Sequence, residues 1–360
     1  MLGKTTARML HALSPETAHD LTVEVFGRIA RTPLISSSIR RDLLVKDPKL
    51  SQELFGDALK KPIHFRNSIG LAAGYDKRIK FIAGADVIGF GFTEVGGITL
   101  LPQNGNPKPR LWRHAEERSL QNFMGLNNPG IAQAMSKLPI NQTGARRHSI
   151  PIGVNLGKGK NTPNEEAVSE YHALMRGMHS RVDYMTINVS SPNTKGLRDL
   201  QSERTIQEIF SLTNSFTTPV MLKISPDIDA SKAIYLCKAA VDCGAKGIIA
   251  TNTTTDYSLL RNPKSVGGIS GAALREKSTK VFAVIAKELF GKCVLIYSGG
   301  VSSSADAIER HRMGASLIQI FTALVYEGAE VVKKINRGIS DTIRREHCKD
   351  ITELIGSRLG

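Results

Sequence analysis

A chain of 360 residues in which 41% are hydrophobic and 22% are charged has the composition of a folded globular protein, which excludes a disordered or collagen-like chain. The 48 Lys and Arg residues outnumber the 33 Asp and Glu residues, and the formal charge of +15 favours anionic partners. No run of five like charges points to nucleic acid, no stretch of 18 apolar residues predicts a membrane span, and the four cysteines lack metal-site spacing.

The first 45 residues are predicted to form two short amphipathic helices, distinct from residues 46–360. Ser14-Pro15-Glu16 resembles a helix start and Pro33 a stop. Two interpretations stay open: the segment packs on the rest of the chain, or it binds a membrane surface through apolar residues flanked by Lys4, Arg8, Arg28 and Arg31. The apolar residues at near-helical spacing are Leu10, Leu13, Ala18, Leu21, Val25 and Ile29.

From about residue 61, short β-branched runs alternate with longer segments of helical period, which is typical of parallel strands with crossover helices. The predicted strands span 68–72, 92–95, 150–155, 184–189, 220–224, 247–251, 294–298 and 317–321. The predicted helices include 163–178, 202–213, 230–241, 272–289 and 303–313. Eight such strands predict a (β/α)8 TIM barrel, and the proline-containing stretch 97–148 is expected to fold over its mouth.

Polar residues gather where the predicted strands end, and in this fold those ends build the active site. The run Asn188-Val-Ser-Ser-Pro-Asn193 carries more amides and hydroxyls than a helix cap needs, which indicates a planar polar ligand. Glycine-rich stretches at 298–301 and 314–316 indicate a phosphate group bound by backbone N–H groups. The stretch 153–159 only imitates a nucleotide-binding P-loop, and no motif supports a metal.

Lys223 stands inside an apolar strand, where an unpaired ammonium is costly to bury. Three roles remain open from the residues alone: a Schiff-base nucleophile, a fixed charge that holds an anionic cofactor or intermediate, and an internal salt bridge.

Six segments together resemble the class 2, quinone-dependent dihydroorotate dehydrogenases, in both order and spacing. The segments are Leu71-Ala-Ala-Gly-Tyr-Asp-Lys77, Gln121-Asn-Phe-Met-Gly-Leu-Asn-Asn128, Asn188-Val-Ser-Ser-Pro-Asn-Thr194, Lys223, Ala250-Thr-Asn-Thr-Thr254 and Gly267-Gly-Ile-Ser-Gly271. Residues 11–22 also resemble the N-terminal helix of that class. The resemblance implies oxidation of (S)-dihydroorotate to orotate in de novo pyrimidine biosynthesis, with FMN as cofactor and a quinone as the final electron acceptor.

The resemblance also implies site residues. FMN is expected at Ala73, Gly74, Lys77, Gly97, Asn155, Asn188, Lys223, Thr251, Gly271, Gly300, Phe321 and Thr322. Dihydroorotate is expected at Lys77, Asn122, Phe123, Met124, Gly125, Leu126, Asn188, Asn193, Asn252 and Thr253. Ser191 would be the catalytic base, and Lys223 would act as a fixed charge near the flavin rather than as a Schiff base.

Two further residues, His19 and Arg113, would be the polar groups at the inner end of an apolar quinone tunnel. The class implies peripheral attachment to the cytoplasmic face of the bacterial cell membrane. Four residues depart from the usual family pattern: Gly97, Phe123, Leu126 and Phe321. The alternatives are a dihydrouridine synthase, which would carry a catalytic cysteine and an RNA-binding domain, a Schiff-base lyase or aldolase that uses Lys223, and a non-catalytic lipid-surface module.

Overall fold

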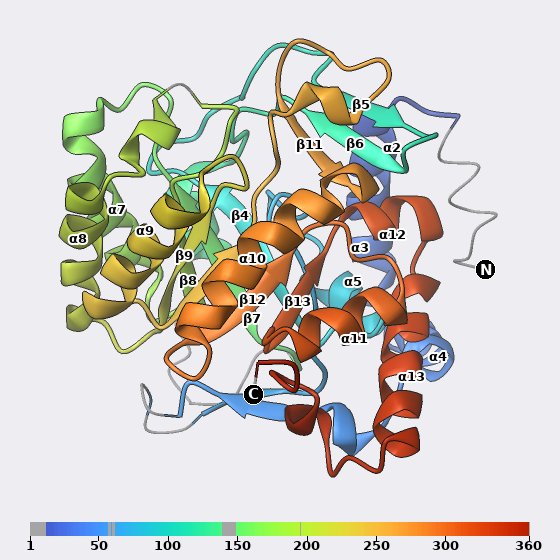
Figure 1. Ribbon diagram of the computed structural model, residues 1–360. Helices are drawn as coiled ribbons and strands as arrows, with labels where there is room; N and C mark the ends of the chain where they lie inside the picture. Colours follow the sequence, from blue (N-terminus) through green and yellow to red (C-terminus); the bar gives the residue numbers. More distant parts are fainter. Residues whose placement is uncertain (1–11, 57–58, 60–61, 139–148, 195, 360) are drawn as a thin grey trace.

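Eight parallel strands close into a barrel in the computed structural model, which describes residues 12–56, 59, 62–138, 149–194 and 196–359 (Figure 1). The strands follow one another around the barrel in chain order, and the last pairs with the first. They are β3 (Ile69–Leu71), β4 (Phe92–Ile98), β7 (Ile152–Gly157), β8 (Tyr184–Asn188), β9 (Val220–Ile224), β10 (Gly247–Ala250), β12 (Val294–Ser298) and β13 (Leu317–Ile320). The predicted TIM barrel is therefore confirmed.

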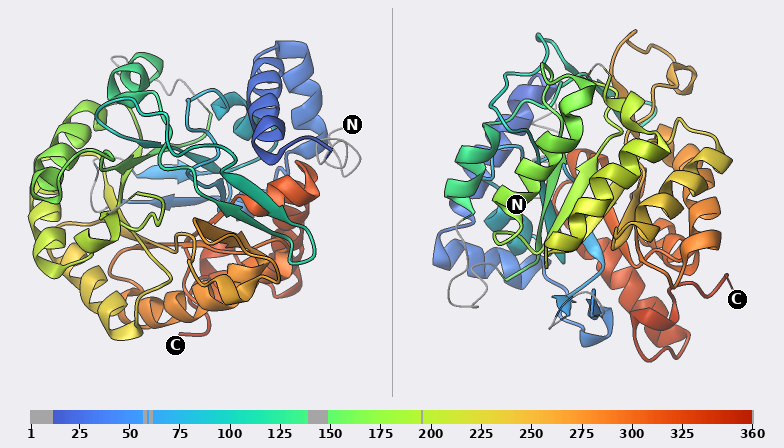
Figure 2. Two further views of the ribbon diagram at one scale, coloured as in Figure 1. Left: turned by 90° about the horizontal axis from the view of Figure 1, so that it is seen from above. Right: turned by 90° about the vertical axis from the view of Figure 1, so that its left-hand side faces the viewer.

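Helices surround the strands, as the view from above shows (Figure 2). They are α5 (Ile82–Val87), α6 (Gly130–Lys137), α7 (Ala167–Met178), α8 (Glu203–Ser211), α9 (Ala230–Asp242), α10 (Arg275–Leu289), α11 (Ser304–Arg312), α12 (Thr322–Glu327) and α13 (Glu330–Arg345). Side chains of Ser202, Asp229 and Ser303 accept backbone N–H groups at the starts of α8, α9 and α11, so these helices begin where the sequence offers a cap.

The two ends of the barrel interior differ in chemistry. One end is filled by a cluster of large apolar side chains, and the hairpin of β1 (Gln52–Leu54) and β2 (Ile63–Phe65) lies below it (Figure 1). The cluster contains Phe55, Ile63, Phe65, Phe92, Tyr184, Met221, Ile249, Ile296 and Leu317. Because this end is packed, a ligand can enter only at the opposite end, where the strands finish.

A three-stranded antiparallel sheet covers that opposite end (Figure 1). Its strands are β5 (Leu111–His114), β6 (Ser119–Asn122) and β11 (Gly268–Gly271), with β6 in the middle. The first two belong to the stretch 97–148 that was expected over the barrel mouth, although residues 139–148 lie outside the described residues. The third comes from the segment after β10, so two distant parts of the chain form the cover together.

The N-terminal segment contains α2 (Pro15–Leu21), a π-helical turn (Thr22–Phe26), α3 (Gly27–Ile29) and α4 (Pro33–Leu43). Ser14 caps α2, as predicted. The first helical stretch ends at Ile29, shortly before Pro33, as predicted, and Pro33 also begins α4, where a missing N–H costs nothing. Lys4, Arg8 and Leu10 lie outside the described residues.

Both faces of this segment carry apolar residues. Ala18, Val23 and Phe26 are buried against the barrel, and ion pairs from Glu24 to Lys80 and from Glu16 to Arg110 fasten the segment to it. The outward face exposes Leu13, Leu21, Val25, Leu34 and Ile35. Within the part of the chain that the structure describes, no helix is long and apolar enough to cross a bilayer.

Candidate active site

A cavity at the barrel mouth is lined by residues that lie in the last part of the barrel strands or just after them, and all eight strands contribute. Every position at which the family resemblance implies a flavin contact lines this cavity: Ala73, Gly74, Lys77, Gly97, Asn155, Asn188, Lys223, Thr251, Gly271, Gly300, Phe321 and Thr322. The cavity thus collects residues that are far apart in the chain, because parallel strands finish at the same edge.

Most of the residues expected to bind dihydroorotate line the same cavity. Besides Lys77 and Asn188 they are Asn122, Met124, Leu126, Asn193, Asn252 and Thr253, together with Ser191. Phe123 and Gly125 do not line it. Successive residues of an extended chain point to opposite sides. Because Asn122 and Met124 point into the cavity, Phe123, which stands between them in the chain, points away from it. Gly125 backs onto the side chain of Asn106, which a Cβ at that position would meet at 2.7 Å.

Two of the departures from the family pattern fit one another. A Cβ on Gly97 would lie 2.9 Å from Cδ2 of Leu126, and a Cβ on Gly157 would lie 2.8 Å from its Cδ1. The side chain of Leu126 therefore occupies the space that these glycines leave, so residues 97 and 126 should be exchanged only together.

Lys223 stands at the floor of the cavity and is 5% exposed. Its ammonium has one hydrogen-bond acceptor in the described structure, Oε1 of Gln319 at a long 3.5 Å. Burial lowers the pKa of Lys223, and the charge of Glu94 opposes that effect. An ammonium with three donors and one weak acceptor is suited to an anionic ligand above it. Sequence reasoning missed Gln319 and Glu94, although Glu94 is as unusual in an apolar strand as Lys223.

A chain of side-chain amides crosses the floor. Asn188 donates from Nδ2 to Oδ1 of Asn155 at 2.9 Å, and Asn252 donates to Oδ1 of Asn188 at 3.2 Å. Ser190 donates its hydroxyl to the carbonyl oxygen of Lys223 at 2.8 Å. The Ser191 hydroxyl, buried beside it, accepts the N–H of Asn193 at 3.3 Å. This arrangement leaves the hydroxyl hydrogen of Ser191 free to point into the cavity.

Lys77 brings a second cation to the cavity. The turn after β3 is held by the carboxylate of Asp76, which accepts backbone N–H groups of Lys80 at 2.8 Å and Phe81 at 2.7 Å. Lys77 Nζ donates to the carbonyl oxygen of Gly74 at 2.6 Å. Burial lowers the pKa of Lys77 to about 8, so it is mostly cationic at neutral pH. It can pair with a carboxylate of a small ligand.

Glycines expose the backbone at the end of the cavity beside β13. Gly300 has a φ of 77° and Gly271 a φ of 98°, which favour glycine. A Cβ on Gly300 would meet the carbonyl oxygen of Gly271 at 2.8 Å. At Gly74 a Cβ would enter open space, with only Phe321 nearby at 3.8 Å. This end can admit a phosphate to backbone N–H groups without a covering side chain.

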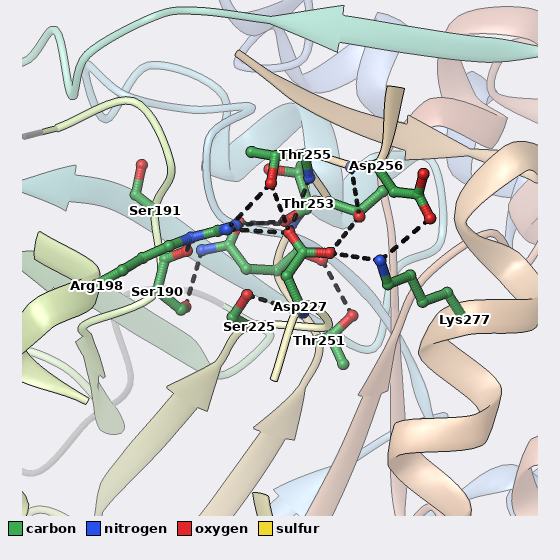
Figure 3. Close-up of polar contacts among 12 residues, drawn as sticks. Ser190, Ser191, Arg198, Ser225, Asp227, Thr251, Thr253, Thr255, Asp256 and Lys277 are labelled. Atoms are coloured by element: carbon green, nitrogen blue, oxygen red, sulfur yellow. Dashed lines mark hydrogen bonds and ion pairs between the residues drawn. The ribbon is translucent and has the colours of Figure 1, made fainter. Parts of the chain in front are cut away.

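Behind the site, Asp227 holds several loops together (Figure 3). Its carboxylate receives Arg198 Nη1 at 2.9 Å, Lys277 Nζ at 2.9 Å, the N–H of Thr255 at 2.8 Å and the hydroxyl of Thr254. Burial acts to raise the pKa of Asp227, but the hydrogen bonds from Lys277 and Thr254 outweigh it and lower the pKa to about 2. Asp227 therefore stays ionised over the physiological range.

Arg198 links Asp227 to the loops that line the cavity (Figure 3). Its Nε donates to the carbonyl oxygen of Ser190 at 3.1 Å, and its Nη2 donates to that of Thr253 at 3.1 Å. The loop with Ser191 and the loop with Thr253 are thereby fixed relative to each other. Residues 198, 227 and 277 are too far apart in the chain for any sequence pattern to have paired them.

A second, mainly apolar cavity lies between the N-terminal helices and the barrel. His19 and Arg113 both line it, and His19 also lines the first cavity with Leu111, Leu120 and Phe321. His19 stacks on Phe321 with ring centroids 6.3 Å apart. Burial and the charge of Lys77 lower the pKa of His19 to about 3, so its ring is neutral at pH 7. The remaining lining includes Ala18, Phe26, Tyr75, Phe81, Ile88, Leu324 and Val325.

Comparison with known proteins agrees with this geometry. The dihydroorotate dehydrogenase family model matches residues 59–343. The chain is 47% identical over 350 residues to a dihydroorotate dehydrogenase (quinone) of a Nitratiruptor species, covering 97% of both chains. It is 38% identical over 360 residues to one of Helicobacter acinonychis (strain Sheeba), covering 100% of both.

The structure is also similar to solved ones. It matches the crystal structure of a dihydroorotate dehydrogenase from Eimeria tenella in complex with ferulenol, with a TM-score of 0.78, 29% identity and 95% of each chain covered. The family match spans most of the chain and includes the barrel and the cavity at its mouth. The chain therefore belongs to the dihydroorotate dehydrogenase family.

Proposed function

We propose that this protein oxidises (S)-dihydroorotate to orotate, with FMN as its cofactor and a membrane quinone as the final electron acceptor. The family is flavin-dependent, and the similar bacterial proteins carry the name dihydroorotate dehydrogenase (quinone). The observation that carries the proposal is the buried ammonium of Lys223, which has one weak acceptor among the described residues and faces a cavity rich in polar groups. Within the described residues no cluster of three or more His, Cys, Asp or Glu could hold a metal ion.

The hydrogen-bond donors and the ammonium group of the cavity suit the phosphate and the ring of FMN. The backbone at Gly271, Gly300 and Thr322 would receive the phosphate, and Lys223 would hold negative charge on the ring. When bound, the flavin supplies the two-electron acceptor for the reaction. Asn155 and Asn188 would orient it through their side-chain amides, which both donate and accept hydrogen bonds.

The substrate would lie between this floor and the covering sheet. Lys77 would pair with its carboxylate, while Asn122, Asn193 and Asn252 would bind the polar edges of the ring. Ser191 would remove the proton from C5 as general base, and that proton would leave through a neighbouring hydroxyl or water. The sheet of β5, β6 and β11 would limit the access of water to the substrate.

The quinone would occupy the second cavity. Its apolar lining suits a prenylated ring, and His19 and Arg113 would be the polar groups at its inner end. Residues 1–45 would form the membrane-facing segment and residues 46–360 the catalytic barrel. The exposed side chains of Leu21, Val25, Leu34 and Ile35 support peripheral contact with a bilayer, which we assign to the cytoplasmic face of the bacterial cell membrane.

The overall assignment is tested by comparing electron acceptors. Purified protein loaded with FMN should convert dihydroorotate to orotate when a short-chain quinone is supplied, and much more slowly with fumarate or NAD. Orotate formation can be followed by its ultraviolet absorbance. Turnover supported by fumarate or NAD but not by the quinone would refute the assigned acceptor, and no orotate with any acceptor would refute the reaction.

The role of Lys77 predicts a pH dependence. Its pKa is lowered to about 8, and only the cationic form, which dominates below that pH, can pair with the substrate carboxylate. We expect kcat/KM for dihydroorotate to fall about tenfold per pH unit above pH 8, because kcat/KM reports ionisations of the free enzyme. In Lys77→Arg, whose guanidinium keeps its charge, this fall should disappear even if the rate is lower. A flat wild-type profile from pH 7 to 10 would contradict the role.

Blocking the second cavity should separate the two half-reactions. Ala18 is buried and lines that cavity, whereas Leu21 on the same helix is 44% exposed. Ala18→Trp is therefore expected to lower quinone turnover at least about tenfold while dihydroorotate still reduces the flavin at the normal rate. Leu21→Trp adds the same side chain outside the cavity and should leave both rates unchanged when a soluble short-chain quinone is used, because no bilayer is then involved. Equal slowing of both half-reactions in Ala18→Trp would argue against this entry route.

A further inference from the structure

Glu94 is a buried carboxylate directly behind the active-site floor. It belongs to β4, is 0% exposed and does not line the cavity. Its oxygens accept Nδ2 of Asn155 at 2.8 Å, Nε2 of Gln319 at 2.7 Å and the hydroxyl of Tyr184 at 3.3 Å. All three partners are donors, which is the pattern of an ionised carboxylate, since that group can only accept.

One arm of this network runs to Lys223. A side-chain amide has one oxygen and one NH2 group, so the end that faces Glu94 decides which end faces elsewhere. Because Gln319 gives its NH2 group to Glu94, its Oε1 is turned to the ammonium of Lys223, at 3.5 Å. A reversed amide would place an NH2 group against that ammonium. By holding the amide of Gln319 in this orientation, Glu94 provides Lys223 with its hydrogen-bond acceptor, Oε1 of Gln319.

The other arm runs to the residues expected around the substrate. Asn155 gives its NH2 group to Glu94, which leaves its Oδ1 to accept Nδ2 of Asn188 at 2.9 Å. Asn188 Oδ1 then accepts Nδ2 of Asn252 at 3.2 Å. Asn252 Oδ1 in turn accepts the N–H of Thr253 at 2.8 Å. This arm is fixed at both ends: the carboxylate of Glu94 can only accept, and the backbone N–H groups of Ser190, which donates to Asn188 Oδ1 at 3.2 Å, and Thr253 can only donate.

We infer that Glu94 is a positioning residue which orients both arms of the site and whose negative charge holds the flavin reduction equilibrium toward the oxidised form. The inference rests on the proposed function, which assigns Lys223 to the flavin and Asn188 and Asn252 to the pyrimidine. Flavin gains negative charge on reduction, so a fixed negative charge nearby opposes that step. Through the asparagine arm, the same residue sets which atoms the pyrimidine meets.

Glu94→Gln removes the charge and places an NH2 group among three donors. The flavin-loaded variant should equilibrate with a reference dye at least about tenfold further toward the reduced form, which is about 30 mV for a two-electron couple. Orotate, titrated by its perturbation of the flavin spectrum, should bind at least about tenfold more weakly, because the single amide oxygen of the variant cannot replace both carboxylate oxygens and the NH2 group of Asn155 or of Gln319 loses its acceptor.

A matched control comes from the same barrel interior. The hydroxyl of Thr186, on β8, is buried without a partner among the described residues. Thr186→Val alters a buried polar atom and leaves the network intact, so its dye equilibrium and orotate affinity should stay within about twofold of the wild type. Glu94→Asp, which keeps the charge, should have a dye equilibrium between those of the wild type and Glu94→Gln. Equal shifts in the Asp and Gln variants would overturn the charge assignment.

Should Glu94→Gln fail to accumulate as a flavoprotein, Gln319→Met tests one arm alone. The dye equilibrium should change, while the affinity for orotate should stay that of the wild type. A weaker affinity for orotate in this variant would overturn the assignment of two separate arms. The inference and the proposed function fail differently. A wild-type protein that holds no flavin contradicts the function, whereas a flavin-loaded Glu94→Gln variant with unchanged equilibrium and orotate affinity overturns the inference alone.

Discussion

Replacement of Ser191 by alanine is expected to slow flavin reduction by dihydroorotate by about 10²–10⁴-fold, the usual contribution of a positioned general base. The Ser191 hydroxyl lines the cavity and accepts the N–H of Asn193, which leaves its own hydrogen free to be passed on when it takes a proton. Anaerobic stopped-flow measurement of flavin bleaching gives the rate directly, without the quinone step.

The controls separate the base from general damage. Ser191→Ala should keep its FMN and its affinity for orotate within a few-fold, because the hydroxyl is small and the neighbouring backbone is held by Arg198. Ser169→Ala, on the exposed outer face of α7, removes the same hydroxyl from an unrelated place and should be silent. An unchanged bleaching rate in Ser191→Ala would show that another group removes the proton.

Replacement of Lys223 by methionine is expected to cost the protein its flavin or to slow flavin reduction by about 10²–10³-fold, the loss typical of one preorganised electrostatic group. Methionine keeps most of the side-chain length and removes the charge together with the N–H donors of the ammonium. Burial of the ammonium is unfavourable by itself, but its loss leaves the buried carboxylate of Glu94 without the nearby charge of Lys223, so the variant without flavin should melt lower than the wild type without flavin. Absorbance, bleaching kinetics and thermal melts measure the three quantities.

A second buried lysine provides the contrast. Lys158 is 2% exposed, does not line the cavity, and donates to the carbonyl oxygens of Gly159 at 3.2 Å and Thr162. Lys158→Met should therefore lower stability by removing the two hydrogen bonds that the ammonium donates, while the bound flavin is reduced normally. If Lys223→Met behaved like Lys158→Met, with lower stability and normal reduction, Lys223 would be a structural residue.

The barrel strands were predictable because each is an apolar, β-branched run between turn residues, and all eight lie where those runs are. The sheet of β5, β6 and β11 was not, because β11 pairs with β6 across a long stretch of chain and no local pattern encodes that pairing. Pro33 marks a boundary that the sequence did show, since one helical stretch ends shortly before it and the next begins at it.

Most residues that line the cavity could be predicted from motifs. The charged residues behind them, which hold the cavity loops and side chains in place, could not. Asp227, Arg198 and Lys277 look like ordinary surface charges in the sequence, and only the fold brings each cation to 2.9 Å from the carboxylate. Glu94 could have been found by the argument used for Lys223, because a lone charge in a buried strand needs a partner. Phe123 and Gly125 were included as part of a continuous motif, although alternate residues of an extended chain face away.

The measurement that tests the account most directly is the visible spectrum of the purified protein during anaerobic titration with dihydroorotate. A flavin spectrum should be present, or should appear on reconstitution with FMN, and it should bleach with one orotate formed per flavin. A colourless protein that takes up no FMN, or a bound flavin that excess dihydroorotate leaves oxidised, would contradict the account.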